Sequence, residues 1–293
     1  MSHKSGFVNI IGSPNVGKST LMNALVGENL SIITPKAQTT RHRILGILNG
    51  EDYQIIFSDT PGVLKPHYKL HESMMKFVEG AFHDADIFLL VTEPGEKAEE
   101  HLALEKLQKS EVPVIVLINK IDLSDQKSIE EKIGEWSKCI PNSQIIPISA
   151  KHKFNLEKIL DVIIANLPEN EPFYSKEELT DKPEKFFIAE IIREKIFLHY
   201  QKEVPYCSEV VIETYKEEEK ITRIRAIIHV ARNSQKGIII GEGGKALKIV
   251  GTEARKSMEE FLQKKVFLEI VVKVSKDWRD DQSQLDKFGY NPK

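Results

Sequence analysis

The first 168 residues alternate short apolar segments with amphipathic ones. The apolar segments are rich in β-branched and aromatic residues and are followed by turn residues, which is typical of buried strands. The apolar positions between them recur at helical spacing, most clearly from Asn155 to Leu167. The pattern predicts a mostly parallel α/β sheet with helices on both faces. We expect its strands at Phe7–Ile11, Tyr53–Phe57, Asp86–Val91, Val114–Ile118 and Gln144–Ile148.

The order of elements changes after a polar stretch that contains Pro168 and Pro172. Two prolines among charged residues favour a linker, which we place at 169–182. Beyond it the pattern predicts an α+β domain over 183–293, preceded by a domain over 1–168. Its expected elements are a helix at 184–200, strands at 207–215 and 221–230, two helices around a glycine turn at 234–262, and a strand at 266–274.

Composition agrees with two globular domains. The chain has 293 residues, of which 41% are hydrophobic, enough for a core in each domain. Its apolar runs fall well short of the ~20 residues that span a bilayer. Cys139 and Cys207 lie far apart, so we expect no disulfide and a reducing, cytoplasmic location. Residues 1–180 carry 19 Lys and Arg against 25 Asp and Glu, whereas 181–293 carry 22 against 19, which suggests different partners for the two halves.

The segment from Gly12 to Ser19 fits the phosphate-binding pattern GxxxxGK[ST]. It follows an apolar strand and precedes a helical run from Thr20 to Val26, as this motif requires. Backbone N–H groups of such a loop surround a β-phosphate at a helix N-terminus. We expect Lys18 to bridge the β- and γ-phosphates and Ser19 to bind Mg²⁺. The predicted nucleotide-binding residues here are Gly12, Asn15, Val16, Gly17, Lys18, Ser19 and Thr20.

The base is read by a second motif, Asn119-Lys120-Ile121-Asp122, which follows the strand at 114–118. Ligands bind at this carboxyl end of parallel strands. The Asp122 carboxylate can accept both N–H groups of a guanine edge. By itself the motif is more typical of a helix cap, but together with the phosphate loop it favours GTP and GDP. We also expect Ser149, Ala150 and Lys151, after the next strand, to place backbone at the guanine carbonyl.

Two further segments are candidates for a metal and for nucleotide sensing. Asp59-Thr60-Pro61-Gly62 ends a predicted strand. Asp59 can hold Mg²⁺ through water and the Gly62 N–H can contact the γ-phosphate, although the same letters can form a simple turn. One threonine of Gln38-Thr39-Thr40-Arg41 can complete the magnesium shell while GTP is bound. We favour Thr40 over Thr39.

In this order and spacing, the motifs resemble those of translation-factor-type GTPases, and the segment Lys36–Arg41 with DTPG resembles the Era family. The resemblance implies that Val63 stands where other GTPases carry a water-orienting Gln, so hydrolysis is intrinsically slow. It also implies that Asn15 binds a potassium ion that supplies positive charge, the alternative being a simple turn residue. The catalytic residues expected on this basis are Lys18, Asn15, Thr40 and Gly62.

The glycine turn of the second domain joins two helical patterns that strands flank. Such a turn can merely cap a helix, but this order resembles a KH domain of the prokaryotic type, which clamps about four nucleotides. Ile191–Lys195 and Glu253–Lys256 again resemble the Era family, so the resemblance covers nearly the whole chain. Glu242 departs from the family pattern by placing a negative charge in the turn. The predicted RNA-binding residues are Arg232, Lys236, Gly241, Glu242, Gly243, Gly244, Lys245 and Lys248.

These observations predict a GTP-hydrolysing switch whose nucleotide state controls RNA binding. The resemblance implies that the RNA is the 3′ end of 16S ribosomal RNA. It also implies a monomer that assists assembly of the small ribosomal subunit and associates peripherally with the inner membrane. One alternative is a non-hydrolysing RNA-binding protein with GTP as a structural ligand. A tRNA-modification-type GTPase is a second alternative, disfavoured because the single phosphate loop is followed by the glycine-turn module.

Overall fold

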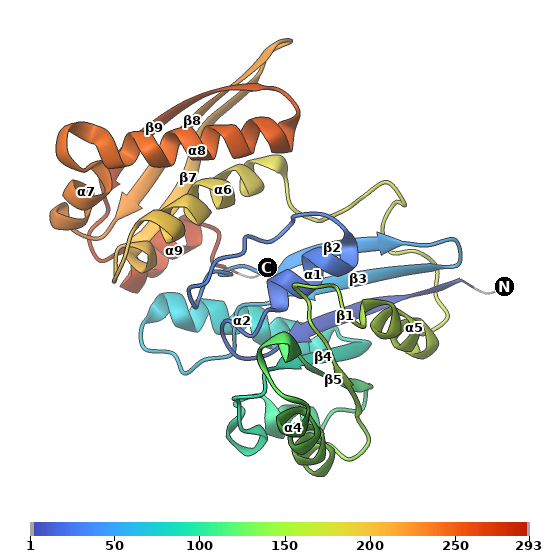
Figure 1. The fold of residues 1–293 in the computed structure, drawn as a ribbon. Helices are drawn as coiled ribbons and strands as arrows, with labels where there is room; N and C mark the ends of the chain where they lie inside the picture. The colour runs from blue at the N-terminus through green and yellow to red at the C-terminus, as the bar shows by residue number, and fades with distance from the viewer. Residues whose placement is uncertain (1–2, 292–293) are drawn as a thin grey trace. The chain divides into compact units, whose positions relative to one another are not determined.

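The computed structural model describes residues 3–291, and its contacts divide the chain into two compact units. The first comprises Met1–Pro66 and Met74–Asp181, and the second comprises His67–Ser73 and Lys182–Lys293. Each unit is described by itself. The predicted order, an α/β domain followed by an α+β domain, is confirmed (Figure 1).

The first unit is built on a six-stranded sheet of order β2-β3-β1-β4-β5-β6. All neighbouring strands are parallel except β2 and β3. The strands are β1 (Lys4–Ile11), β2 (Ile44–Asn49), β3 (Tyr53–Asp59), β4 (Ile87–Thr92), β5 (Val114–Ile118) and β6 (Gln144–Pro147). Every residue of β4 and β5 is buried, as expected for central parallel strands that helices cover on both faces.

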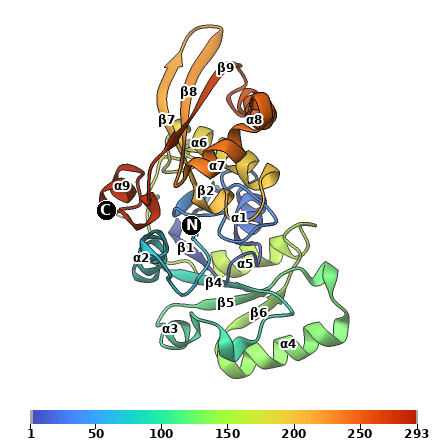
Figure 2. The ribbon, with the colours of Figure 1, turned by 90° about the vertical axis from the view of Figure 1, so that its left-hand side faces the viewer.

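Helices flank this sheet on both faces (Figure 2). The helices are α1 (Lys18–Val26), α2 (Lys69–His83), α3 (Leu104–Gln108), α4 (Gln126–Cys139) and α5 (Leu156–Asn166). One hydrophobic cluster joins α2, α3 and α4 to β1, β4 and β5, with Trp136 of α4 fully buried in it. The central strands are thereby fixed, and the loops that follow their carboxyl ends gain a rigid base.

Strand β2 is the strand of this sheet that the hydrophobic pattern did not predict. It lies at the edge, antiparallel to β3, and Gly46 interrupts its apolar run. A Cβ at Gly46 would lie 2.9 Å from Val26 Cγ2 of α1, so packing requires the glycine. Glycine weakens a strand pattern, and it therefore hid this element.

The segment predicted as a linker is hydrogen-bonded to the first unit. Tyr174 exchanges two hydrogen bonds with the side chain of Gln54, of 2.8 and 2.9 Å. Farther along, the Ile47 N–H of β2 donates to the Leu179 carbonyl at 2.9 Å. Residues up to Asp181 therefore cluster with the first unit, while the predicted domain boundary at 168 stays a prediction.

The second unit has a three-stranded sheet of order β7-β8-β9, in which β7 and β8 are antiparallel and β8 and β9 parallel. One hydrophobic core joins this sheet to α6, α7 and α8. In α6, Ile188, Ile192 and Ile196 repeat every four residues and are fully buried, as one face of a helix requires. The elements are α6 (Glu184–His199), β7 (Ser208–Glu217), β8 (Ile221–Val230), α7 (Asn233–Ile240), α8 (Lys245–Leu262), β9 (Lys265–Val274) and α9 (Gln282–Lys287).

Candidate nucleotide site and nucleic-acid groove

The phosphate loop runs from the end of β1 to the start of α1. Gly17 caps α1 with a φ of +98°, and a Cβ there would lie 2.3 Å from Asn119 Nδ2, so only glycine fits. The Lys18 ammonium donates to the carbonyls of Gly12 at 3.0 Å and Ser13 at 2.8 Å. Burial lowers the pKa of Lys18 to about 8, although Asp59 and Glu96 nearby favour its charged form. The loop therefore holds a desolvated cation that an incoming phosphate can pair.

A set of oxygen ligands lies next to this lysine. The Asp59 Oδ2 atom accepts from Ser19 Oγ at 2.6 Å and from Thr40 Oγ1 at 3.4 Å. The two hydroxyls lie 2.8 Å apart. Asp59 is fully buried, its Oδ1 atom has no hydrogen-bond partner, and burial raises the pKa of its carboxyl. Two hydroxyls and an unsatisfied carboxylate oxygen suit a hard divalent cation such as Mg²⁺.

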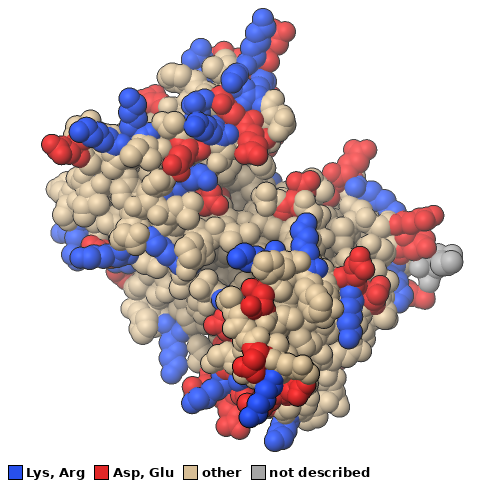
Figure 3. Space-filling model, viewed as in Figure 1, with Lys and Arg blue, Asp and Glu red and all other residues tan. Residues whose placement is uncertain are grey.

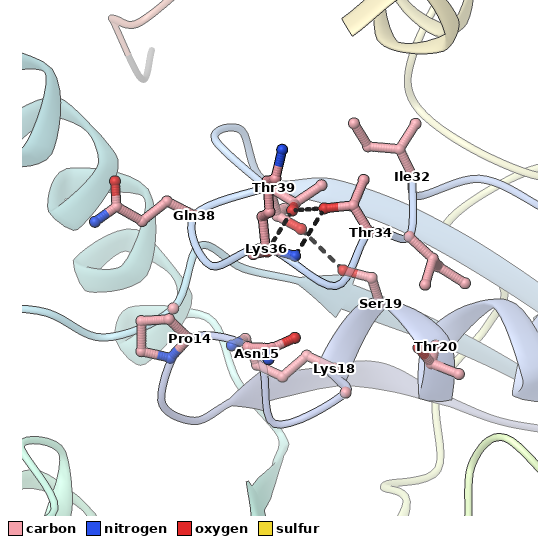
Figure 4. Close-up of a pocket in the computed structure, with 14 residues that line it drawn as sticks. Pro14, Asn15, Lys18, Ser19, Thr20, Ile32, Thr34, Lys36, Gln38 and Thr39 are labelled. Carbon is pink, nitrogen blue, oxygen red and sulfur yellow. Dashed lines mark hydrogen bonds between the residues drawn. The ribbon is translucent and has the colours of Figure 1, made fainter. Parts of the chain in front are cut away.

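The two candidate threonines of the segment Gln38–Arg41, Thr39 and Thr40, have different surroundings. Thr39 Oγ1 donates to the Lys36 carbonyl at 2.8 Å and lies 2.7 Å from Thr34 Oγ1. Figure 4 shows Thr39 in this cluster with Thr34 and Lys36, while Gln38 points away from it. The structure thus brings Thr40, and not Thr39, to Ser19 and Asp59. The expected magnesium role of Thr40 stays a prediction.

The base-reading motif connects three loops of the first unit. Asn119 Nδ2 donates to the Val16 carbonyl at 2.8 Å, and Asn119 Oδ1 accepts from the Ala150 N–H at 2.9 Å. Lys120 Nζ donates to the Asn15 carbonyl at 2.7 Å and to Glu93 at 2.6 Å. The predicted phosphate and base residues are therefore held together by direct hydrogen bonds.

Asp122 lies in a cavity of about 830 Å³ that the phosphate loop, Ala150 and Lys151 also line. Its Oδ1 atom accepts from Ser149 Oγ at 2.6 Å, and this hydrogen bond lowers the pKa of the Asp122 carboxyl. The carboxylate is therefore ionised at neutral pH and able to accept the N–H groups of a guanine edge. The predicted residues Gly17, Thr20 and Asn119 also line this cavity.

Asn15, Gly62 and Val63 are the positions whose predicted roles concern hydrolysis, and their surroundings differ. Asn15 is exposed, has a φ of +65° and lines the phosphate pocket together with Gly62. The Val63 N–H donates to the Gly12 carbonyl at 3.0 Å, which ties the DTPG segment to the phosphate loop. The Val63 side chain packs against the hydrophobic cluster of α2 and β4 and cannot orient a water molecule.

The glycine turn of the second unit connects α7 to α8. Gly243 and Gly244 have φ of +56° and +77° and so reverse the chain where a side chain would be strained. Glu242, Gly243 and Lys245 are exposed. Acidic and basic side chains are interspersed over the face shown in Figure 3. Attraction for a nucleic-acid backbone therefore depends on local lysines and on this exposed turn rather than on a general positive charge.

A groove of about 380 Å³ begins at the turn and runs between α8 and β9. Of the predicted RNA-binding residues, Gly244 and Lys248 line it. Four-residue spacing places Leu247, Gly251 and Arg255 on one face of α8, and this periodicity is the signal that could have identified them. The remaining lining residues are Thr252, Leu268 and Ile270.

Arg232 lies at a different place, at the N-terminal end of α7. It lines a separate cavity of about 120 Å³ with Gln235 and Arg279. The eight-residue helix α7 separates it from the glycine turn by about 12 Å. Lys236 lies within α7, between the two. The structure therefore does not bring Arg232 and the turn together.

Comparison with known proteins gives the same two-part division. Residues 7–120 match the family described as 50S ribosome-binding GTPase, and residues 203–279 match the KH domain. GTPase Era of Clostridium acetobutylicum is 44% identical over 290 residues, which cover 98% of each chain. The chain belongs to the Era family of GTPases. The chloroplastic GTPase ERA-like protein of Oryza sativa subsp. japonica is also 44% identical, over 99% of this chain and 70% of the relative.

Solved structures of Era proteins have the same fold. One, Era in complex with MgGDPNP and nucleotides 1506–1542 of 16S ribosomal RNA, superposes with a TM-score of 0.94 at 39% identity and covers 99% of this chain and 100% of that one. A variant of Aquifex aeolicus Era bound to GDP and AlF4⁻ has a TM-score of 0.92 at 39% identity and the same coverage. Among residues 3–291 of this Era-family chain, no helix has the length and apolar character to cross a membrane.

Proposed function

We propose that this Era-family GTPase hydrolyses GTP slowly and uses its nucleotide state to control binding of the 3′ end of 16S ribosomal RNA during assembly of the small ribosomal subunit. The observation that carries the proposal is one chain with a preorganised phosphate and metal site and a separate KH groove. The Era structure with MgGDPNP and 16S ribosomal RNA supports the choice of RNA. Within this proposal the protein acts as a monomer, and peripheral membrane association stays a prediction.

Lys18, Ser19, Thr40 and Asp59 form the phosphate end of the site. Ser19 and Thr40 would hold Mg²⁺ directly, and Asp59 would hold it through water. The ion supplies charge neutralisation at the β- and γ-phosphates. Lys18 contacts both phosphates, and the Gly62 N–H donates to the γ-phosphate. Thr40 belongs to a segment that leaves the site when this phosphate is lost, which makes it the nucleotide sensor.

Hydrolysis proceeds by in-line attack of water on the γ-phosphorus. Val63 has no group that can position this water, so the intrinsic rate is low. Asn15 contributes a side-chain oxygen at the mouth of the phosphate pocket, where a potassium ion would add positive charge beside the leaving phosphate. Its exposure and its place in the pocket lining support this role.

The KH groove binds single-stranded RNA. Glu242 and Gly243 bring backbone N–H groups to the phosphates, whereas those of Gly241 and Gly244 donate within the chain and shape the turn. Lys245 and Lys248 neutralise the phosphates. Bases lie along the apolar floor that Leu268 and Ile270 form between α8 and β9. The exposed Glu242 carboxylate points outward to solvent when RNA is bound.

Phosphate release measured in potassium and in sodium buffer, with and without RNA, tests the proposal. We expect release in both buffers and a faster rate in potassium, and we expect Asn15→Ala to abolish the difference while GTP still binds. Release that is absent under every condition, despite tight GTP binding, would instead identify a non-hydrolysing RNA-binding protein. The apolar surroundings of Val63 are the observation that favours this alternative.

A further inference from the structure

The loop between β4 and α3 contacts the phosphate loop through one pair of side chains. The Glu96 carboxylate accepts a hydrogen bond from the hydroxyl of Ser13 through its Oε1 atom. Ser13 is the second residue of the phosphate loop, and its carbonyl accepts from Lys18 Nζ at 2.8 Å. Glu96 is therefore linked through Ser13 to Lys18, the cation expected to contact the phosphates.

Glu96 is itself held rigidly. Its Oε2 atom accepts from Thr92 Oγ1 at 2.8 Å, and its backbone carbonyl accepts from Lys132 Nζ at 2.5 Å. Its side chain is only 17% exposed. A carboxylate that has a second hydrogen bond, on a residue whose backbone is also held, is a defined acceptor. A hydrogen bond to it restrains the donor more than a bond to a mobile surface side chain would.

A buried histidine completes the set. His101 Nδ1 accepts from the Ala103 N–H at 3.2 Å, so the proton of the neutral ring lies on Nε2. This Nε2 atom is buried without a hydrogen-bond partner and lies 3.8 Å from Glu96 Oε1. The two groups form no hydrogen bond, but they are close enough for the ring N–H dipole to attract the carboxylate oxygen that Ser13 contacts.

We propose that Glu96 is a positioning residue for the phosphate-binding loop, which it holds through the hydroxyl of Ser13. The proposal rests on the proposed GTP binding by this loop. Backbone N–H groups bind a phosphate well only if they converge before it arrives, because ordering a loop on binding costs entropy. Glu96 supplies this order to the part of the loop that both GDP and GTP contact. Loss of Glu96 therefore weakens the binding of GDP and of GTP equally and leaves the turnover of bound GTP unchanged.

Dissociation constants for GDP and GTP, measured by titration of fluorescent analogues, test this role together with kcat at saturating GTP. We expect Glu96→Ala and Ser13→Ala each to raise the dissociation constants of both nucleotides about tenfold, with kcat unchanged. We expect the double variant to be no weaker than either single one, because both break the same link. Glu96→Gln keeps an acceptor oxygen and should restore binding to within about threefold. Glu99→Ala removes a charge from an exposed position of the same loop and should bind as wild type does.

The possible failures are distinct. Full binding by Glu96→Ala, or additive losses in the double variant, would overturn the role of Glu96 while GTP binding by the wild type stands. A wild-type protein without affinity for either nucleotide would refute the proposed function and this inference together. If Glu96→Ala does not fold, Glu96→Asp provides the same test, because it retains the charge but withdraws the carboxylate from Ser13. We expect Glu96→Asp also to bind about tenfold more weakly, and wild-type affinity would contradict the proposal.

Discussion

The nucleotide site and the KH groove are built in opposite ways. At the phosphate end of the nucleotide site the charged groups are buried and already hydrogen-bonded: Lys18 is 6% exposed and donates to two carbonyls, and Asp59 is fully buried beside Ser19 and Thr40. In the KH module the lysines of the turn are exposed and the recognition element is backbone that glycine leaves bare. The first arrangement supports precise recognition by a few groups, and the second spreads binding over many weak contacts. Substitutions in the nucleotide site should therefore have large, specific effects on binding, and substitutions in the KH groove should have smaller and more general ones.

The largest effect is expected for Asp122→Asn. The carboxylate accepts two N–H groups of guanine, whereas an amide offers its own N–H groups to the same edge. We expect GTP affinity to fall about hundredfold and xanthosine triphosphate to become the preferred ligand. Competition binding of the two nucleotides measures the change.

Asp125→Asn is the matched control, because Asp125 is an exposed carboxylate nearby whose role is to cap α4 by accepting from the Ser128 N–H. Asparagine caps a helix equally well, so this variant should bind GTP as wild type does. If Asp122→Asn continued to prefer GTP, the assignment of Asp122 to base reading would be wrong.

Gly243→Asp should act on the other site alone. It adds a negative charge to the exposed turn and strains a backbone with φ of +56°. We expect RNA affinity to fall about tenfold with GTP affinity unchanged, as measured by filter binding of a 16S 3′-end oligonucleotide. Gly134→Asp, an exposed glycine in α4 with free space around it, should leave both affinities intact. Wild-type RNA binding by Gly243→Asp would count against the KH assignment.

The variants Lys248→Ala and Arg232→Ala test whether RNA binds in the groove or at the N-terminal end of α7. Lys248 lines the groove, whereas Arg232 lines a separate cavity. We expect Lys248→Ala to weaken RNA binding about fivefold and to reduce its salt dependence, as loss of one phosphate contact does, and Arg232→Ala to change neither. The reverse order would show that RNA follows a path along α7 instead of the α8–β9 groove.

The smallest expected effect is a pH dependence of nucleotide binding. The pKa of Lys18 is about 8 in the free site, and a bound phosphate raises it. Below pH 8 the lysine is charged in both states and affinity is flat; above pH 8 binding requires uptake of a proton, so affinity falls. Between pH 7.0 and 8.5 we expect GDP to bind about fourfold more weakly. An affinity that stays constant or rises over this interval would contradict the lowered pKa.

The sequence predicted the nucleotide site better than the groove, for a physical reason. The motifs at Gly12–Ser19, Asp59–Gly62 and Asn119–Asp122 each follow a buried parallel strand, so their residues converge wherever that sheet forms. Thr40 belongs to no such strand end, and only the folded chain brings it, rather than Thr39, to Asp59.

The features that the sequence did not predict depend on tertiary packing, which the local pattern of hydrophobic and polar residues does not encode. Strand β2 was missed because Gly46, needed against α1, interrupts its apolar run. Leu247 and Arg255 can be recognised as groove residues only in the folded chain, where they line the groove together with Ile270 of β9. Glu96 is 83 residues from Ser13 in sequence, so no motif could connect the two.

The most direct test is the affinity of a labelled 16S ribosomal RNA 3′-end oligonucleotide for the full chain, measured by fluorescence anisotropy with Mg²⁺ and either GDPNP or GDP. A switch in which the γ-phosphate controls the KH groove predicts tighter RNA binding with GDPNP, by about tenfold or more. Equal affinities in the two nucleotide states would contradict it, because the nucleotide site and the groove would then act independently.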